Sequence, residues 1–254
     1  MRLLSGFVAI SCLLLMLFSC GPKVSRLETD PSLTPASLRT QQIGIGGVTS
    51  LIVCEPGSEM SGKDMSNLLR LCIMEKRVDL EVQPEERTRL AVGPGRYEKR
   101  LDTYRLTGEI EPEVLNEIDT LLQNAIRYLI FARVEGDVVE RGTSETVNNQ
   151  GEDDEYTEVK YTSKRTVTVS FVVYDLQQKI PVWSGLVSDD EANHKTHTIE
   201  EEDESFLGSV VKGVIGAVLF GDDDEDQGPY PDPPEFQQVL KKVFEGFALL
   251  LPGE

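Results

Sequence analysis

The sequence predicts an α/β (α+β) fold: a mixed β-sheet of about five strands, covered by amphipathic helices and interrupted by a long polar hairpin insertion. Three patterns in the 254 residues lead to this prediction. Strand-like and helix-like segments alternate in the first half, three strand-like segments follow one another in the second half, and an amphipathic helix ends the chain. This order is typical of a sheet with helices packed on it.

The predicted domain opens with a strand and a helix. Residues 42–54 combine β-branched residues with glycines, which indicates a strand that bends or packs closely against its neighbours. Residues 63–77 predict a helix, because apolar side chains recur at helical spacing and form one face. That face consists of Met65, Leu68, Leu69, Cys72 and Ile73.

Shorter elements come next. Residues 78–83 alternate as a short strand, Pro84 opens a second helical stretch, and Tyr97 to Tyr104 indicates another helix. The strongest helix begins at Pro112, a residue suited to the first turn. Its apolar stripe spans more than three turns and consists of Val114, Leu115, Ile118, Leu121, Leu122, Ala125 and Ile126.

Three strands are expected at residues 128–139, 165–175 and 180–188, the last two joined by a short turn. The polar residues 140–164 predict a solvated hairpin end. A Gly-rich apolar segment at 206–220 precedes an acidic, proline-rich loop at 222–234. The final amphipathic helix carries Phe236, Val239, Leu240, Val243, Phe244 and Phe247.

The N-terminus carries the clearest functional signal. Phe7 to Phe18 is an apolar run of about 12 residues, too short to span a bilayer. It ends in Leu17-Phe18-Ser19-Cys20, which resembles the lipobox of bacterial lipoproteins. Residues 1–19 are therefore expected to be a lipoprotein signal peptide, with Cys20 acylated by chains such as palmitate. The alternative is an ordinary signal peptide with a chance cysteine.

The domain boundaries follow from the anchor. Residues 20–41 contain three prolines and no apolar period, which predicts a lipidated tether. Residues 42–254 are expected to form a single periplasm-facing domain, with its core at 42–190 and a C-terminal helical part at 200–254. By resemblance to diderm lipoproteins, Gly21 in place of an aspartate after Cys20 favours the outer membrane.

The net charge of the chain excludes some classes of binding partner. A formal net charge of −19 at pH 7 repels nucleic acid and anionic lipid headgroups, so no nucleic-acid partner is expected. The acidic domain is expected to stand off the membrane that its acyl chains grip. No later stretch has 18 uninterrupted apolar residues, so no transmembrane helix is predicted.

Two cysteines remain beyond the anchor. An oxidising export compartment would allow a disulfide between Cys54 and Cys72, whose loop closure would contribute about 3 kcal/mol. The alternative is two buried free thiols, and the sequence does not choose between them.

Catalytic and metal-binding patterns are sparse. His194 and His197 lie among carboxylates and are the weak candidates for a divalent-metal site, but no third ligand is set by spacing. No Gly-x-Ser-x-Gly elbow occurs. No cofactor is assigned, and a non-enzyme is expected.

The later strands resemble a group of periplasmic lipoproteins. The segments Tyr128 to Val134, Val173 to Leu176 and Val182 to Gly185 carry this resemblance. The group includes the curli-secretion channel lipoprotein and the outer-membrane activators of penicillin-binding proteins. The resemblance implies a fold like the amino-terminal domain of the periplasmic Tol-system protein. It also implies binding to envelope proteins, oligomeric assembly or secretion, with no catalytic residue.

One departure from that group matters. The curli channel builds its pore from hairpins of alternating apolar residues, whereas residues 140–164 are dense in Asp and Glu. Because charge facing lipid costs about 2–4 kcal/mol at mid-membrane, a pore from this segment is disfavoured. The expected function is a membrane-anchored, non-enzymatic, protein-binding adaptor in the cell envelope. The alternatives are an oligomeric component of an export or surface-assembly apparatus and, less favoured, a metal-dependent enzyme.

Overall fold

The computed structural model describes residues 22–52, 60–148, 156–200 and 229–253. The chain divides into two compact units. Unit 1 is Met1–Asp137, Thr166–Asp190 and Glu235–Glu254, and unit 2 is Val138–Arg165 and Glu191–Pro234. A single domain at residues 42–254 stays a prediction. The second unit contains the parts of three strands that continue beyond the positions where the sequence pattern ends them.

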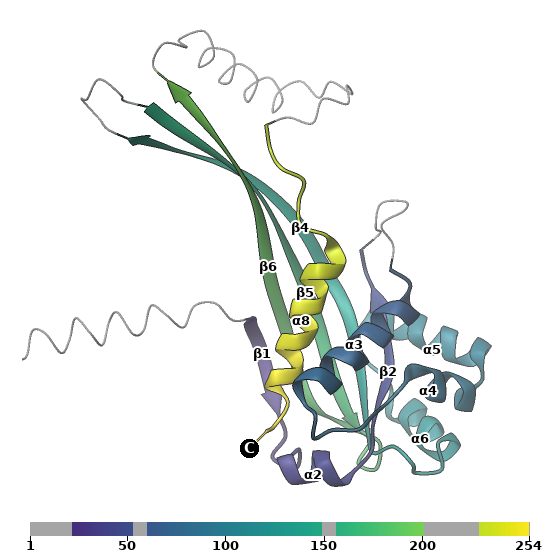
Figure 1. Ribbon diagram of the computed structural model, residues 1–254. Coiled ribbons are helices and arrows are strands. Elements are labelled where there is room, and N and C mark those ends of the chain that lie inside the picture. The colour runs from purple at the N-terminus through teal and green to yellow at the C-terminus, as the bar shows by residue number, and fades with distance from the viewer. Residues whose placement is uncertain (1–21, 53–59, 149–155, 201–228, 254) are drawn as a thin grey trace, which may run out of the picture. The chain divides into compact units, whose positions relative to one another are not determined.

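A six-stranded mixed sheet, in the order β1-β6-β5-β4-β2-β3, organises the fold (Figure 1). It confirms the expected class. Strand β1 pairs antiparallel with β6, and β2 runs parallel to both β3 and β4. The strands are β1 Lys23–Thr29, β2 Ile43–Ser50, β3 Val82–Gln83, β4 Tyr128–Asn148, β5 Tyr156–Asp175 and β6 Ile180–Glu200.

Helices pack on the two faces of this sheet in unit 1. They are α2 Pro35–Thr40, α3 Gly62–Lys76, α4 Glu85–Val92, α5 Pro94–Thr107, α6 Pro112–Leu121 and α8 Phe236–Leu250. Figure 1 shows α3 and α8 side by side on one face of the sheet. The core beneath these two helices contains residues of β6, β5, β4 and β2. Among the described residues, no helix is both long and apolar enough to cross a membrane.

Aromatic stacking fixes α8 on the first face. Phe247 stacks on Phe171 of β5 with ring centroids 4.1 Å apart and meets Trp183 of β6 edge-on at 5.1 Å. The predicted amphipathic helices behave as expected on this face: Met65, Leu69, Cys72 and Ile73 of α3 are buried. Helix α8 therefore belongs to the core of unit 1, and the expected core at 42–190 was too narrow.

Helices α4, α5 and α6 cover part of the second face. Their core includes Phe131 of β4 and Tyr174 of β5, and it contains no residue of β6 or β1. Gly47 of β2 allows α5 to approach closely, because a Cβ there would lie 2.5 Å from the Tyr97 hydroxyl. The close packing expected from the glycines of this strand is thus confirmed.

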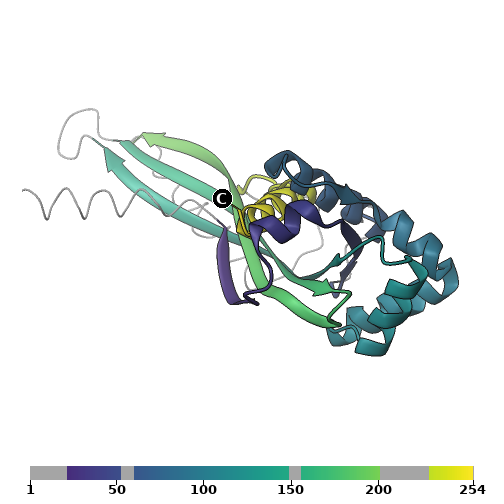
Figure 2. The same cartoon turned by 90° about the horizontal axis from the view of Figure 1, so that it is seen from below.

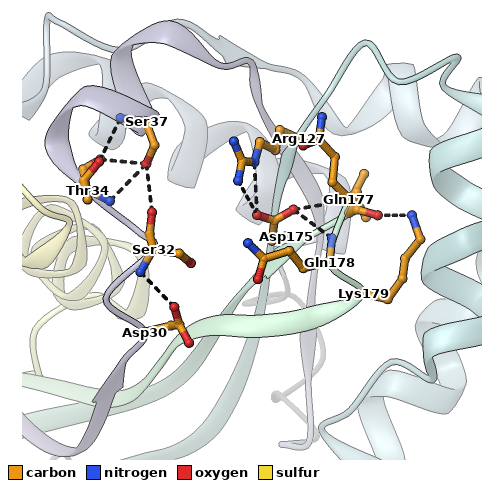
Figure 3. A network of polar contacts seen from close by, with 10 residues as sticks. Asp30, Ser32, Thr34, Ser37, Arg127, Asp175, Gln177, Gln178 and Lys179 are labelled. Carbon is orange, nitrogen blue, oxygen red and sulfur yellow. Dashed lines mark hydrogen bonds and ion pairs between the residues drawn. The ribbon is translucent and has the colours of Figure 1, made fainter.

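The expected tether at residues 20–41 is wrong from Pro22 onward. Strand β1 pairs with β6 over Lys23 to Thr29, and Leu33 and Leu38 of the following segment are buried. Helix α2 is stabilised locally, because Thr34 and Ser37 form a capping box and Pro35 occupies the first turn (Figure 3). Residues 23–29 lack a strong strand pattern, and it is the open edge of β6 that supplies their backbone partners.

A polar cluster closes the end of the sheet at the β5–β6 turn (Figure 3). Asp175 accepts hydrogen bonds from the backbone of Gln177 and Gln178 and pairs with Arg127, which lies directly before β4. Lys179, at a φ of 60°, bonds to the Leu176 carbonyl and pairs with Asp119 of α6. The turn expected between the last two strands is confirmed, and it is tied to both β4 and α6.

Unit 2 consists of the far parts of β4, β5 and β6 with residues 229–234. Most of the expected hairpin end at 140–164 is regular strand, and only 149–155 lies outside the described residues. Val159 and Tyr161 are buried with Tyr230 packed against them. The Tyr230 hydroxyl lies 3.0 Å from the Thr143 hydroxyl, so residues 229–234 are fastened to the strands.

Candidate docking cleft on the open face of the sheet

The second face of the sheet is bare where α4, α5 and α6 do not reach, as Figure 2 shows from below. Side chains alternate along β5 and β6 because a strand has a period of two. Val169, Phe171 and Trp183 point into the core beneath α8, while the intervening side chains of β5 and β6 are half-buried on the opposite face. Those on the bare face are Thr168, Ser170, Val172, Ser184 and Leu186.

A cleft of about 390 Å³ lies on this bare face. Strands β4, β5 and β6 form its floor, the loop between α5 and α6 forms one wall, and Arg26 of β1 lies at another side. Its volume is at the lower end of the range of small-ligand and side-chain pockets, about 300–1,000 Å³. The lining contains no histidine or cysteine.

An ion pair forms part of the floor. Arg133 donates from Nε and Nη2 to Glu135 Oε1, each at 2.8 Å, and from Nη1 to the Arg105 carbonyl at 3.2 Å. The Ser170 hydroxyl donates to the same Glu135 oxygen at 2.6 Å. The Arg133 and Glu135 side chains are both mostly buried, and these hydrogen bonds fix their orientation.

Gly108 brings the α5–α6 loop over this ion pair. Its φ is 77°, and a Cβ there would lie 3.0 Å from the Arg133 guanidinium. A side chain would therefore be strained by the backbone and would also displace Arg133. Gly108 therefore ends helix α5 and also leaves room for the Arg133 guanidinium in the cleft.

Arg26 is presented by an irregularity in β1. The register between β1 and β6 shifts between Ser25 and Glu28, and Arg26 has a φ of 54°. A left-handed arginine costs roughly 1 kcal/mol or more, so the surrounding pairing must hold it. Arg26 is exposed, and no ion pair links it to another described residue. The bulge therefore places an available cation, followed by the half-exposed Leu27, beside the cleft.

The predicted cysteine sites are only partly described. Cys20 and Cys54 lie outside the described residues. Cys72 is buried, and its Sγ lies 3.9 Å from the Lys241 carbonyl oxygen. Burial, reinforced by the nearby Glu245, raises the pKa of the Cys72 thiol to about 12. Cys72 points into the core as expected, and its pairing with Cys54 stays a prediction.

The two candidate histidines do not converge. His194 Nδ1 lies 2.9 Å from the Thr162 hydroxyl, whereas the His197 ring packs edge-on against Tyr161 at 5.7 Å. Neighbouring residues of β5 point to opposite faces, so the two histidines do too. Among the described residues, no group of three His, Cys, Asp or Glu side chains could hold a metal ion.

The cleft residues were missed by sequence reasoning. Arg133 and Glu135 alternate with apolar residues in the expected strand 128–139, and two opposite charges on one strand face were an available signal. Nothing in the local pattern identified Arg26, because it lies 107 residues from Arg133 in the chain, within the segment expected as a tether.

Comparisons with known proteins place the chain in no family. No family model matches it, and no curated protein does. A PelC dodecamer structure from Paraburkholderia phytofirmans is 14% identical, over 91% of this chain and 99% of that one, with a TM-score of 0.36. The LpoB C-terminal domain from Salmonella enterica is 9% identical, over 63% and 87%, with a TM-score of 0.34.

A third solved structure is the lipoprotein GNA1162 from Neisseria meningitidis, 15% identical over 70% of this chain and 97% of that one, with a TM-score of 0.24. TM-scores this low are weak likenesses and show no shared function.

Proposed function

We propose that this chain is a lipid-anchored protein of the bacterial outer membrane that faces the periplasm and binds other envelope proteins through its cleft, without itself catalysing a reaction. The observation that carries the proposal is the bare face of β5, β6 and β1, with its cleft beside Arg26. The lipobox at Leu17 to Cys20 supports the anchor.

The chemistry of the bare face suits a polypeptide partner. Half-buried hydroxyls on Ser170 and Ser184 provide hydrogen-bonding groups, and Val172 and Leu186 provide apolar contact area. Arginine is enriched among residues that dominate interface energetics, and Arg26 is the available one. The rigid floor formed by Arg133 and Glu135 needs no reordering on binding, which limits the entropic cost.

Anchoring makes a modest affinity sufficient. A protein confined to the membrane surface meets partners on that surface at an effective concentration set by the geometry of its attachment. The cleft lining has no nucleophile paired with a histidine base, which supports binding over catalysis as its role.

The proposal is tested by site-specific photocrosslinking in cells. A photoreactive residue at Ser184 should capture a partner that the same residue at Val78, an 89% exposed position outside the cleft, does not capture. Arg26→Glu should abolish the capture. Lys99→Glu, an equal charge change at an exposed position of α5, should leave it intact. Equal capture at both positions, or no effect of Arg26→Glu, contradicts the cleft.

The anchor has its own test. Cys20→Ser should release the protein from the membrane fraction and leave its signal peptide uncleaved at that position. Retention and normal trimming of this variant would contradict the lipoprotein assignment.

A second function, as an oligomeric component of an envelope apparatus, is favoured by one observation. Strand β2 pairs with β4 only as far as Val134, and β1 pairs with β6 only as far as Ser188. Beyond these residues, no strand of the described chain occupies the outer edges of β4 and β6. Unpaired edges are templates for pairing with another chain. Native mass spectrometry of the acylated protein in detergent should then show a closed oligomer, and a monomer would exclude this role.

A further inference from the structure

Pro22 is in close contact with the C-terminal helix α8. Pro22 lies against Gly246 of α8 so closely that a Cβ on Gly246 would be 2.5 Å from Pro22 Cγ and 2.7 Å from Pro22 Cβ. Lys23, the next residue, pairs with Ser188 of β6. The first described residue is therefore held by packing, and the second by a strand ladder.

This contact leaves almost no chain between the anchor and the fold. Only Gly21 separates Cys20 from Pro22. Two residue steps span at most about 7 Å. A tether of 20 residues or more would have let the domain move freely above the bilayer, and this linkage does not.

We propose that the acylated protein rests directly on the membrane, with the surface around Pro22, Lys23 and the last turn of α8 against the lipid headgroups. This inference depends on the proposed acylation of Cys20. It names the lipid surface as the partner of that patch, because the acyl chains must enter the bilayer within about 7 Å of Pro22.

The local surface is compatible with headgroup contact, although the chain as a whole is strongly acidic. Lys23 is 76% exposed, with Asp190 at 3.5 Å, and the last turn of α8, Phe247 to Leu250, carries no charged side chain. Lys241, which lies before that turn, pairs with Glu245 at 3.6 Å. Repulsion from the rest of the chain is screened over about 8 Å at physiological salt. The linkage between Cys20 and Pro22 is no longer than this screening length, so electrostatic repulsion cannot hold the patch away from the membrane surface.

Position 249 is suited to a probe of contact between this patch and lipid. It lies three residues after Gly246, hence on the same side of α8, and its side chain is 65% exposed. Leu106 of α5 is the matched control: it is 71% exposed, and its helix packs on the other face of the same sheet. The single tryptophan of the chain, Trp183, is 1% exposed and gives a constant background.

The test uses the acylated full-length protein in phosphatidylcholine vesicles that contain headgroup spin-labelled lipid. Leu249→Trp should be quenched several-fold more than Leu106→Trp, whose quenching should match that of the parent. Lys23→Trp gives a second reporter on the patch if Leu249→Trp does not fold. Inserting about 20 Gly/Ser residues between Gly21 and Pro22, with an r.m.s. span of about 25 Å, should abolish the difference while the protein still floats with the vesicles.

The outcomes separate the two ideas. A protein that does not float with vesicles lacks the anchor, which overturns the proposed function. A protein that floats but shows equal quenching at positions 249 and 106, or the same quenching with and without the inserted linker, keeps its anchor and overturns the direct contact.

Discussion

Arg127 donates two hydrogen bonds, from Nε at 3.0 Å and Nη2 at 2.9 Å, to a single oxygen of Asp175. The Asp175 side chain is fully buried, and its other oxygen accepts the backbone N–H groups of Gln177 and Gln178. One carboxylate therefore closes the β5–β6 turn and ties it to the residue directly before β4. The pairing also raises the pKa of Arg127.

Asp175→Asn should lower the free energy of unfolding by about 3 kcal/mol, because it leaves Arg127 without its buried counter-charge. Asp102→Asn, at a carboxylate that is 69% exposed, should cost less than about 0.5 kcal/mol. Urea unfolding measures both. Equal effects of the two substitutions would show that the Arg127–Asp175 pair contributes little.

Gly246→Ala should weaken the attachment of β1, even though alanine favours a helix over glycine by about 1 kcal/mol. The added methyl group would overlap the Pro22 ring. Amide exchange of Val24 and Ser25 should accelerate, and urea unfolding should show a loss of stability. In a Pro22→Gly background the same substitution should become neutral or stabilising. A stabilising effect with Pro22 present would contradict the tight contact.

Phe247→Ala should cost about 3–5 kcal/mol, because it removes the ring that stacks on Phe171 and meets Trp183. The emission of Trp183 should shift to the red as its site becomes hydrated. Leu249→Ala, an exposed substitution on the same helix, should change neither property. Unchanged tryptophan emission in Phe247→Ala would show that the core of unit 1 repacks around the cavity.

Cys72 should resist alkylation by iodoacetamide at pH 8 in the folded protein, since burial raises the pKa of its thiol to about 12 and thiolate is the reactive form. In urea without a reductant, Cys72 should react if it is free and stay unreactive if it is bonded to Cys54. Cys54→Ser removes the only proposed partner. Reactivity in urea that appears only in this variant would establish the disulfide.

Asp79 should make the stability depend on pH. Hydrogen bonds from Arg77, together with Arg39, hold the pKa of the Asp79 carboxyl far below its ordinary value of 3.8. Because the folded-state pKa is the lower one, this stabilisation is present above pH 3.8 and is lost as the pH falls further.

The variant Asp79→Asn isolates this contribution. It should be about 1–2 kcal/mol less stable than the parent at pH 7, and this difference should shrink steadily as the pH falls below 3.8. Thermal unfolding from pH 7 to pH 2 measures the difference. A gap between parent and variant that does not narrow on acidification would mean that Asp79 acts through its shape and not its charge.

Helix positions and faces could be predicted from the sequence because helical periodicity is a local property. Met65, Leu69 and Cys72 of α3 are buried where the spacing placed them, and so is Phe247 of α8. The turn after Asp175 was equally local. Strand lengths were predicted less well: β4 ends at Asn148 instead of residue 139, since polar residues can continue a strand whenever a neighbouring strand pairs with them.

The cleft could not be predicted from the sequence in the same way. Its parts come from β1, from the α5–α6 loop and from β4 to β6, and only the sheet order brings them together. The candidates that the sequence did offer, His194 and His197, are separated by strand geometry, because two residues three apart in a strand point to opposite faces.

The sequence by itself determined the mixed α/β class and the apolar faces of the main helices, because each depends on residues close together in the chain. Only the tertiary structure decided that residues 23–29 form an edge strand, that Pro22 packs on Gly246 and that Arg26 lies beside the floor of Arg133 and Glu135. These features depend on which edge or helix is available to a segment after folding, and no local pattern of side chains encodes that.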